Sequence, residues 1–270
     1  MPHEFTDGWT TAISAIALLI GLTGVFLYFW GMAASGRKGR YRRWPGRRPL
    51  CWSSGIFFAW LPLSPFFLEA AHHDFRFHMT GHLLLGMAAP MLMAAGAPVK
   101  LLLRSLPVNK ARKVAGVIRK PVFSFYRHPV TASVLNIGGL WILYTTPLFG
   151  LMHHHPLLFL LVHAHLFLAG YLFTVSVLYF DPAPNGHSPL FRTIVFIPSL
   201  AAHGILSKLL YAYPPSGVSL EQARQGAMIM YYGGDLIDLA IIVVLFHGWY
   251  KKPGYRRTKS RFGAKKPVSL

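Results

Sequence analysis

Histidine is the residue type with the most obvious chemical use in this sequence, where it occurs 14 times in 270 residues. His78 and His82 are four positions apart, so on a helix their side chains lie on one face, about one turn from each other. Two imidazoles at that spacing can share a metal ion. Two histidines near a membrane surface are more often solvated or capping groups, so the pair alone only raises the hypothesis of a metal site.

The segments that must position these histidines are long and apolar. Hydrophobic residues make up 53% of the chain and charged residues 13%, and the mean hydropathy is +0.41, which excludes an ordinary soluble domain. A membrane-spanning helix needs about 20 apolar residues, and its backbone polar groups must bond within the helix. We therefore predict an all-α bundle of about seven transmembrane helices in a single membrane domain. The predicted spans lie near residues 9–32, 52–70, 79–96, 130–151, 157–180, 192–212 and 226–249.

The Lys and Arg residues cluster between the apolar segments and give the chain a formal net charge of +19. Such clusters prefer the cytoplasmic side of a membrane. We therefore expect residues 37–48, 100–127 and a basic tail at 251–270 inside, and the amino terminus outside. The first apolar segment is long and has no basic stretch before it, so we interpret it as a retained span and not as a cleaved signal peptide. The basic loops are expected to contact anionic lipid headgroups, and nucleic-acid binding is disfavoured.

Three further ionisable residues fall at one depth under this topology. His163, His203 and Asp235 each lie about seven to ten residues from the outer end of their helix, which places them roughly 10–15 Å below the outer surface. Ionisable groups inside a bilayer usually face the interior of a bundle and pair with another group. Asp238, three positions after Asp235, is a candidate for a supporting partner. His165 would point about 200° away from His163 and cannot face the same site.

Methionines near these histidines suggest which metal would suit the site. Thioether and imidazole ligands together suit Cu(I), whereas sites rich in carboxylates suit magnesium, calcium or manganese. Most methionines in apolar helices only fill space, but Met79 and Met152 lie near the predicted outer entrances and are worth testing, and Met79 is taken as a candidate ligand. The single cysteine, Cys51, excludes an internal disulfide and any site with two thiolates. The candidate metal ligands are His78, His82, His163, His203, Asp235 and Met79.

Three stretches of the sequence form a recognisable pattern. They are residues 78–98, which begin HMTGHLLL and continue through Ala89-Pro90 to Gly96-Ala97-Pro98; residues 163–170, HAHLFLAG; and residues 226–230, GAMIM. Together they resemble the CtaG family of cytochrome c oxidase assembly proteins. The similarity extends from about the second to the seventh predicted helix. Two departures concern the site: Val162 stands where the family pattern has Glu, and residues 233–238 lack the tryptophan of many members.

The resemblance implies a protein of the bacterial plasma membrane that is needed to mature a haem–copper oxidase and that handles copper. Its implied partners are oxidase subunits and a copper donor protein, and no catalytic turnover is implied. A copper carrier must release its ion, which a few neutral ligands open to exchange would allow. The alternative is a membrane oxidoreductase that uses a di-metal centre or a haem, with His163 and His203 approaching the porphyrin from two helices.

Overall fold

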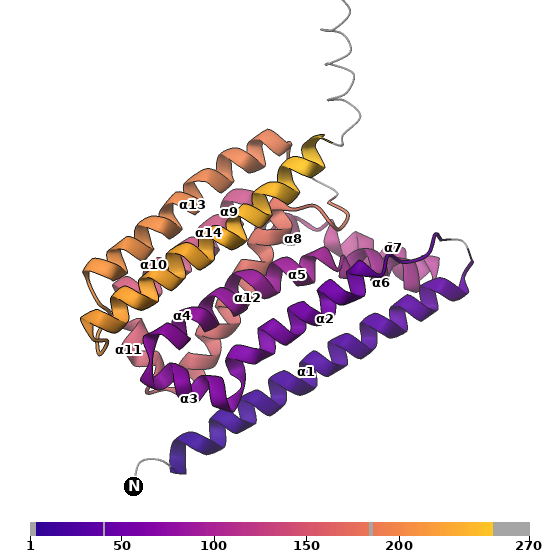
Figure 1. Cartoon of the computed structure of the whole chain (residues 1–270). Coiled ribbons are helices and arrows are strands. Elements are labelled where there is room, and N and C mark those ends of the chain that lie inside the picture. Colours follow the sequence, from indigo (N-terminus) through magenta and orange to yellow (C-terminus); the bar gives the residue numbers. More distant parts are fainter. Residues whose placement is uncertain (1–3, 40, 184–185, 251–270) are drawn as a thin grey trace, which may run out of the picture.

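A computed structural model describes residues 4–39, 41–183 and 186–250, and the predicted basic tail at 251–270 lies outside the described residues. Every regular element in the described residues is helical, and the long helices lie side by side in one bundle (Figure 1). The prediction of an all-α membrane bundle is therefore confirmed. The α-helices are α1 (Glu4–Arg37), α2 (Arg47–Trp60), α3 (Pro65–His73), α4 (Phe75–Leu83), α5 (Ala89–Ala95), α6 (Pro98–Ser105), α7 (Val108–Ile118), α8 (Pro121–Tyr126), α9 (Pro129–Ser133), α10 (Gly139–Thr145), α11 (Leu148–Met152), α12 (Pro156–Val177), α13 (Pro189–Ala212) and α14 (Leu220–Tyr250).

Five helical segments of the described chain are long and apolar enough to span a membrane. They are Gly8–Arg37, Phe75–Ser105, Pro156–Val177, Pro189–Ala212 and Leu220–Tyr250. A sixth span is counted when Arg47–Leu63 and Pro65–His73, which are bent by 52°, are taken together. The remaining predicted span, 130–151, is a shorter helical run that ends at Thr145. This arrangement supports a multi-pass membrane protein.

Two predicted helices are interrupted immediately before a proline. Ser64 and Thr146 both have extended backbone conformations, and Pro65 and Pro147 follow them. The proline ring disfavours the helical conformation of the residue that precedes it. The predicted spans near 52–70 and 130–151 are therefore interrupted, and the residues after each break form α3 and α11.

A freed backbone carbonyl determines how α12 packs against the segment that joins α4 to α5. Pro90 has no N–H, so it cannot bond to the carbonyl of Gly86 four residues earlier. The chain takes a π-helical turn here, at Leu84–Ala88. A Cβ atom at Gly170 of α12 would overlap the Gly86 carbonyl oxygen. Glycine therefore lets the two backbones approach closely at this crossing.

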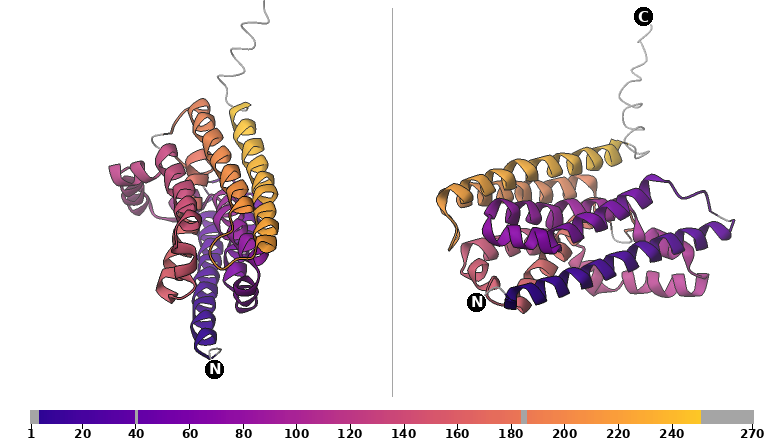
Figure 2. Two further views of the ribbon diagram at one scale, coloured as in Figure 1. Left: turned by 90° about the vertical axis from the view of Figure 1, so that its left-hand side faces the viewer. Right: turned by 60° about the horizontal axis from the view of Figure 1, so that its bottom comes forward.

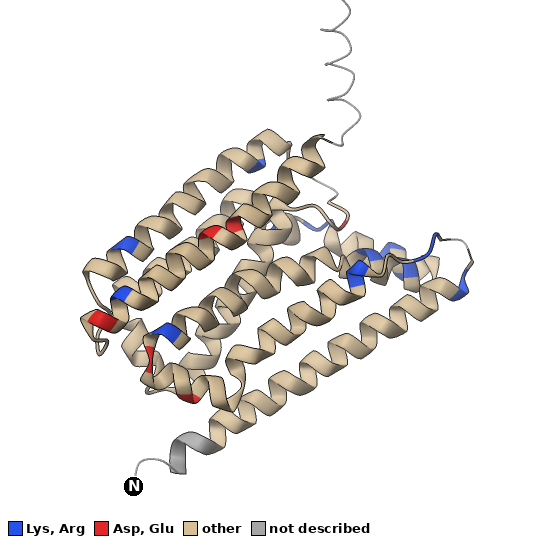
Figure 3. Cartoon of the chain, viewed as in Figure 1, with Lys and Arg blue, Asp and Glu red and all other residues tan. Residues whose placement is uncertain are grey.

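The two ends of the bundle differ in charge. Most of the Lys and Arg residues gather where α1 ends and the short helices α6 and α7 lie, which we call the basic end (Figure 3). Figure 2 shows these short helices set off to one side of the long ones. The opposite end holds α3, α11 and the start of α14, together with several Asp and Glu residues. We call it the histidine end because His72 and His73 close α3 and three more histidines follow α11.

Helix α6 is bonded at both of its ends by side chains from distant parts of the chain. Asp181 accepts hydrogen bonds from the backbone N–H groups of Val99 and Lys100, at 3.3 and 2.7 Å. Lys38 Nζ donates to three carbonyls at the carboxyl end of α6, at 2.6 to 3.0 Å. Each charge complements the dipole of the helix end that it contacts and bonds groups that the helix itself leaves unpaired.

We expect Gly170→Ala to lower the amount of folded protein in the membrane, because the added methyl group meets a backbone atom that cannot move aside. Overpacking of this kind costs about 1–3 kcal/mol or more. Gly150→Ala is the matched control, since a Cβ there would have no atom within 4 Å. The measurement is the yield and thermal stability of both variants in detergent. Equal yields and stabilities would contradict the close packing of α12 on Gly86.

Candidate metal centre

A cavity at the histidine end is lined by five imidazoles, and we call it the end cavity. The five are His72, His78, His82, His153 and His163. They come from α3, α4, the turn after α11, and α12, so four parts of the chain converge here. The cavity offers about 30 Å³ of space to a water-sized molecule, which is enough for an ion or a water.

Of the two methionines near the predicted entrance, the structure places Met152 and not Met79 in the lining of the end cavity. Met79 is fully buried, and its Sδ lies 3.8 Å from the Tyr144 hydroxyl, which donates to it. The same hydroxyl is 3.1 Å from His78 Nε2. When its proton is directed at the sulfur, the hydroxyl accepts from His78 Nε2–H. The Nδ1 atom of His78 then keeps a lone pair that can bind a metal.

His163 and His165 point in opposite directions, as the helical spacing predicts. His163 Nδ1 donates to the Phe159 carbonyl at 2.9 Å, and the two rings stack with centroids 3.9 Å apart. Because a carbonyl can only accept, Nδ1 carries the proton and Nε2 keeps the lone pair. His165 Nε2 donates instead to the Leu135 carbonyl at 3.1 Å. Of these two histidines, only His163 therefore lines the end cavity.

His203 lies deeper, in the lining of a second cavity that we call the middle cavity. Its polar lining consists of His82, Asn136, Thr174, Ser199, His203 and Asp238. Two side chains, His82 and Leu166, line both cavities and separate them. The middle cavity offers about 20 Å³ to a water-sized molecule. The six predicted ligands are thus not gathered at one point, and His82 is the predicted ligand that lines both cavities.

The buried carboxylate of α14 is Asp238 and not Asp235. Asp238 is 4% exposed and lines the middle cavity, whereas Asp235 is exposed and lines neither cavity. The expectation that Asp235 faces the interior of the bundle therefore differs from the structure. Three positions along a helix turn by about 300°, so the two side chains point about 60° apart, and the rotation of α14 within the bundle places Asp238 inside and Asp235 at the surface.

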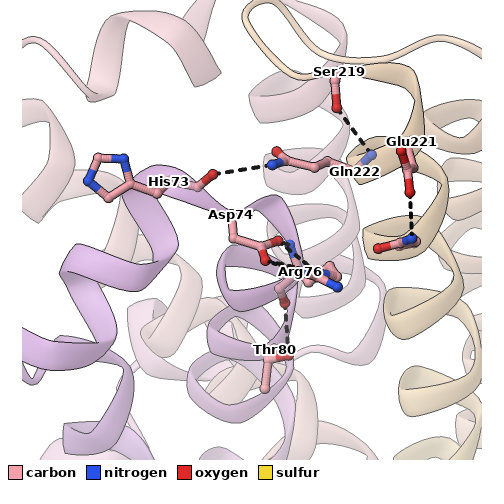
Figure 4. Close-up of polar contacts among 8 residues, drawn as sticks. His73, Asp74, Arg76, Thr80, Ser219, Glu221 and Gln222 are labelled. Carbon is pink, nitrogen blue, oxygen red and sulfur yellow. Dashed lines mark hydrogen bonds and ion pairs between the residues drawn. The ribbon is translucent and has the colours of Figure 1, made fainter.

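The position of α4 is fixed at the rim of the histidine end by the junction between α3 and α4 (Figure 4). Asp74 caps α4 by accepting from the Arg76 backbone N–H at 2.8 Å, and its side chain forms an ion pair with Arg76 at 2.5 Å. The Gln222 amide of α14 donates to the His73 carbonyl at 3.3 Å. These contacts hold the turn of α4 that carries His78 against the start of α14.

Among residues 4–39, 41–183 and 186–250, no three His, Cys, Asp or Glu side chains are placed so that they could hold one metal ion together. The histidines instead occur in pairs and small groups of rings. The ring centroids of His72 and His153 are 5.2 Å apart, and those of His82 and His203 are 6.1 Å apart. Three or more His, Cys, Asp or Glu ligands for one ion would therefore require side chains to rotate.

Comparison with known proteins identifies the family. The sequence profile of the cytochrome c oxidase caa3 assembly factors (Caa3_CtaG) matches residues 26–252. The chain belongs to this family. Similar curated proteins include uncharacterized proteins of Mycobacterium bovis and Mycobacterium tuberculosis, each 33% identical over 179 residues, which is 62% of this chain and 26% of each relative.

An uncharacterized protein of Mycobacterium leprae is 28% identical over 212 residues, which is 75% of this chain and 30% of that protein. The chain therefore spans between about a quarter and a third of the length of these curated relatives. No solved structure matches it.

Two residues of the cavities of this Caa3_CtaG protein carried no strong sequence signal. Tyr144 is an aromatic residue near the end of an apolar helix, and only the structure shows that its hydroxyl contacts His78. Asn136 lies in the second π-helical turn, Val134–Gly138, which no residue pattern predicts. The run of three histidines that includes His153 is visible in the sequence. Its first member lines the end cavity because α11 positions the turn that follows it.

The environment of His153 keeps its imidazole neutral at physiological pH. Burial first, and then the neighbouring His72, lower the pKa of His153 to about 4. An unfolded chain would take up this proton near pH 6.5. Between these two pH values the unfolded state binds more protons, so the folded state loses stability as the pH falls from about 6.5 towards 4.

We expect the thermal stability of the metal-free protein in detergent to fall between pH 7 and pH 5, and His153→Phe to reduce that fall. The substitution removes one group that only the unfolded state protonates in this range. His154→Phe, at the exposed neighbouring position, is the control. An identical pH dependence in the wild type and the His153 variant would show that this imidazole does not contribute.

Proposed function

We propose that this protein is a cytochrome c oxidase assembly factor that binds copper in the end cavity and passes it to an oxidase subunit, without catalysing a reaction of its own. The observation that carries the proposal is the convergence of five imidazoles from four parts of the chain on one small cavity. Packing alone does not require five ionisable rings at one end of an apolar bundle.

The chemistry of the end cavity suits Cu(I) better than a harder divalent cation. Its potential ligands are imidazole nitrogens and the thioether of Met152, and no Asp or Glu of the described residues lines it. Neutral nitrogen and soft sulfur ligands favour Cu(I), whereas magnesium, calcium and manganese prefer carboxylate and carbonyl oxygens. Neutral ligands and a monovalent ion also limit the charge that must be placed within the bundle.

The same cavity is suited to release as well as to binding. His72 is exposed at the rim, and Tyr144 and the Phe159 carbonyl hold the protons of His78 and His163 away from their free nitrogen atoms. In known metal sites, a hydrogen bond to the second ring nitrogen of a histidine orients the ring toward the metal, and these two hydrogen bonds would orient His78 and His163 in the same way. An ion bound near the rim by a small number of ligands can be transferred by ligand exchange to a partner or accepted from a copper donor protein.

The haem alternative receives no support from the arrangement of the two histidines that would ligate it. His163 lines the end cavity and His203 lines the middle cavity. A porphyrin between them would have to displace His82 and Leu166, which separate the two cavities. A Soret band in the purified protein would nevertheless favour a haem-dependent oxidoreductase over a copper carrier.

We further propose that the protein lies in the bacterial plasma membrane with the histidine end outside and the basic end in the cytoplasm, because Lys and Arg prefer the cytoplasmic side. In a Cys51→Ser background, Ser216→Cys in the loop before α14 should react with an impermeant thiol reagent added to intact cells. Arg112→Cys on α7 should react only after the cells are opened. The reverse labelling pattern would place the histidines in the cytoplasm and remove the case for copper loading from outside.

We expect His163→Phe to weaken Cu(I) binding by the purified protein at least tenfold, because loss of even an outer contact commonly costs about 10–100-fold in metal affinity. His165→Phe is the matched control, with the same replacement two positions away on the opposite side of α12. The measurement is anaerobic titration against a chromogenic Cu(I) chelator. In cells, His163→Phe should lower oxidase activity at normal protein abundance. Unchanged affinity in both variants would exclude the end cavity as the copper site.

A further inference from the structure

The middle cavity contains ring nitrogens that are buried without a partner. His82 and His203 are each 4% exposed. Among the described residues, both ring nitrogens of His82 and the Nε2 atom of His203 have no hydrogen-bond partner. A buried polar atom without a partner costs about 1–3 kcal/mol, so three such atoms beside one cavity indicate that a ligand completes them.

The two rings are spaced as they would be around a shared ion. Their centroids are 6.1 Å apart and their planes are inclined by 19°. Metal–imidazole bonds are about 2 Å long, so two rings that share one ion across a wide N–metal–N angle have centroids about 6 Å apart. To share an ion, the two side chains must rotate until one nitrogen of each ring faces it.

A carboxylate is available to balance the charge of an ion at this place. Asp238 is buried and lines the same cavity, and in the described part of the chain no Lys, Arg or hydrogen-bond donor pairs with it. A carboxylate and a monovalent cation together carry no net charge, which lowers the cost of placing both within the bundle. The end cavity, in contrast, has no carboxylate in its lining.

The surrounding backbone is shaped for this pair of histidines. A Cβ at Gly234 of α14 would lie 2.6 Å from His203 Cε1, so glycine at that position makes room for the ring. Both π-helical turns contribute to the cavity, the first through Gly86 and Met87 and the second through Asn136. Such turns are rare in helices and are frequent at functional sites.

We propose that His82 and His203 bind a second Cu(I) ion in the middle of the bundle, that Asp238 balances its charge, and that this ion exchanges with the end cavity through His82. This inference rests on the proposed copper function and adds a place where the ion is held away from the aqueous rim. Because His82 lines both cavities, the ion can pass between them by ligand exchange, and it need not lose all of its protein ligands on the way. No bond other than the metal–ligand bonds changes, and copper keeps its oxidation state.

The test is the Cu(I) stoichiometry of the full chain, purified in detergent and titrated anaerobically with Cu(I) against a chromogenic chelator. We expect two ions per chain in the wild type and one in His203→Gln, whereas His163→Phe should lose only the ion of the end cavity. Asp238→Asn should lower the binding affinity for one of the two ions at least tenfold, since it removes the balancing charge. Asp235→Asn, the same change at the exposed position, should keep both ions. Gly234→Ala should also lower the affinity for one ion, because the added methyl group displaces the His203 ring.

The outcomes separate this inference from the proposed function. One ion in the wild type that persists in His203→Gln and disappears in His163→Phe would overturn the middle position and leave copper binding at the end cavity intact. One ion that disappears only in His203→Gln would support the middle position and overturn the end cavity. Two ions in every variant would overturn the middle position, and no ion in the wild type would overturn both. If His203→Gln does not fold, the comparison of Asp238→Asn with Asp235→Asn decides.

Discussion

Inside a membrane there is no water to bond a polar group, so each backbone or side-chain polar atom must find a partner within the protein. This constraint explains the helices, and it also explains where they deviate from regularity. Pro90 frees the carbonyl of Gly86, the chain responds with a π-helical turn, and Gly170 allows α12 to cross at that point. The same crossing lies beside the middle cavity, so the irregular backbone and the unpartnered histidines occur together.

The division of the histidines between two cavities has a chemical meaning. The end cavity is lined by neutral ligands near the surface, where an ion can enter and leave. The middle cavity adds the carboxylate of Asp238 and nearly complete burial, which favour a more strongly held ion. One histidine, His82, belongs to both. Under the copper function that we propose, a carrier needs affinity to collect its ion and lability to deliver it, and two connected positions of different character would meet both needs within one bundle.

The sequence was sufficient for the fold class and for the opposite directions of two neighbouring histidines. Hydropathy located the long helices, and helical spacing separated His163 from His165 correctly, because both depend on local geometry. The breaks before Pro65 and Pro147 were also readable in principle, since the restriction on the residue before a proline is local. Which of Asp235 and Asp238 faces inward could not be deduced, because that depends on how α14 is rotated against α4 and α13. The same limit applies to the two methionines. Tertiary packing decides that Met152 lines the end cavity and that Met79 does not.

The charged side chains of the basic end act on the backbone more than on each other. In the described chain the one ion pair joins Arg76 and Asp74 at the opposite end. Asp181 and Lys38 instead bond the amide and carbonyl groups at the two ends of α6. Ionic strength screens pairs of exposed charges, but it has much less effect on short hydrogen bonds to a helix end that is partly buried. The arrangement of α1, α6 and the chain after α12 should therefore persist over a wide range of salt concentration.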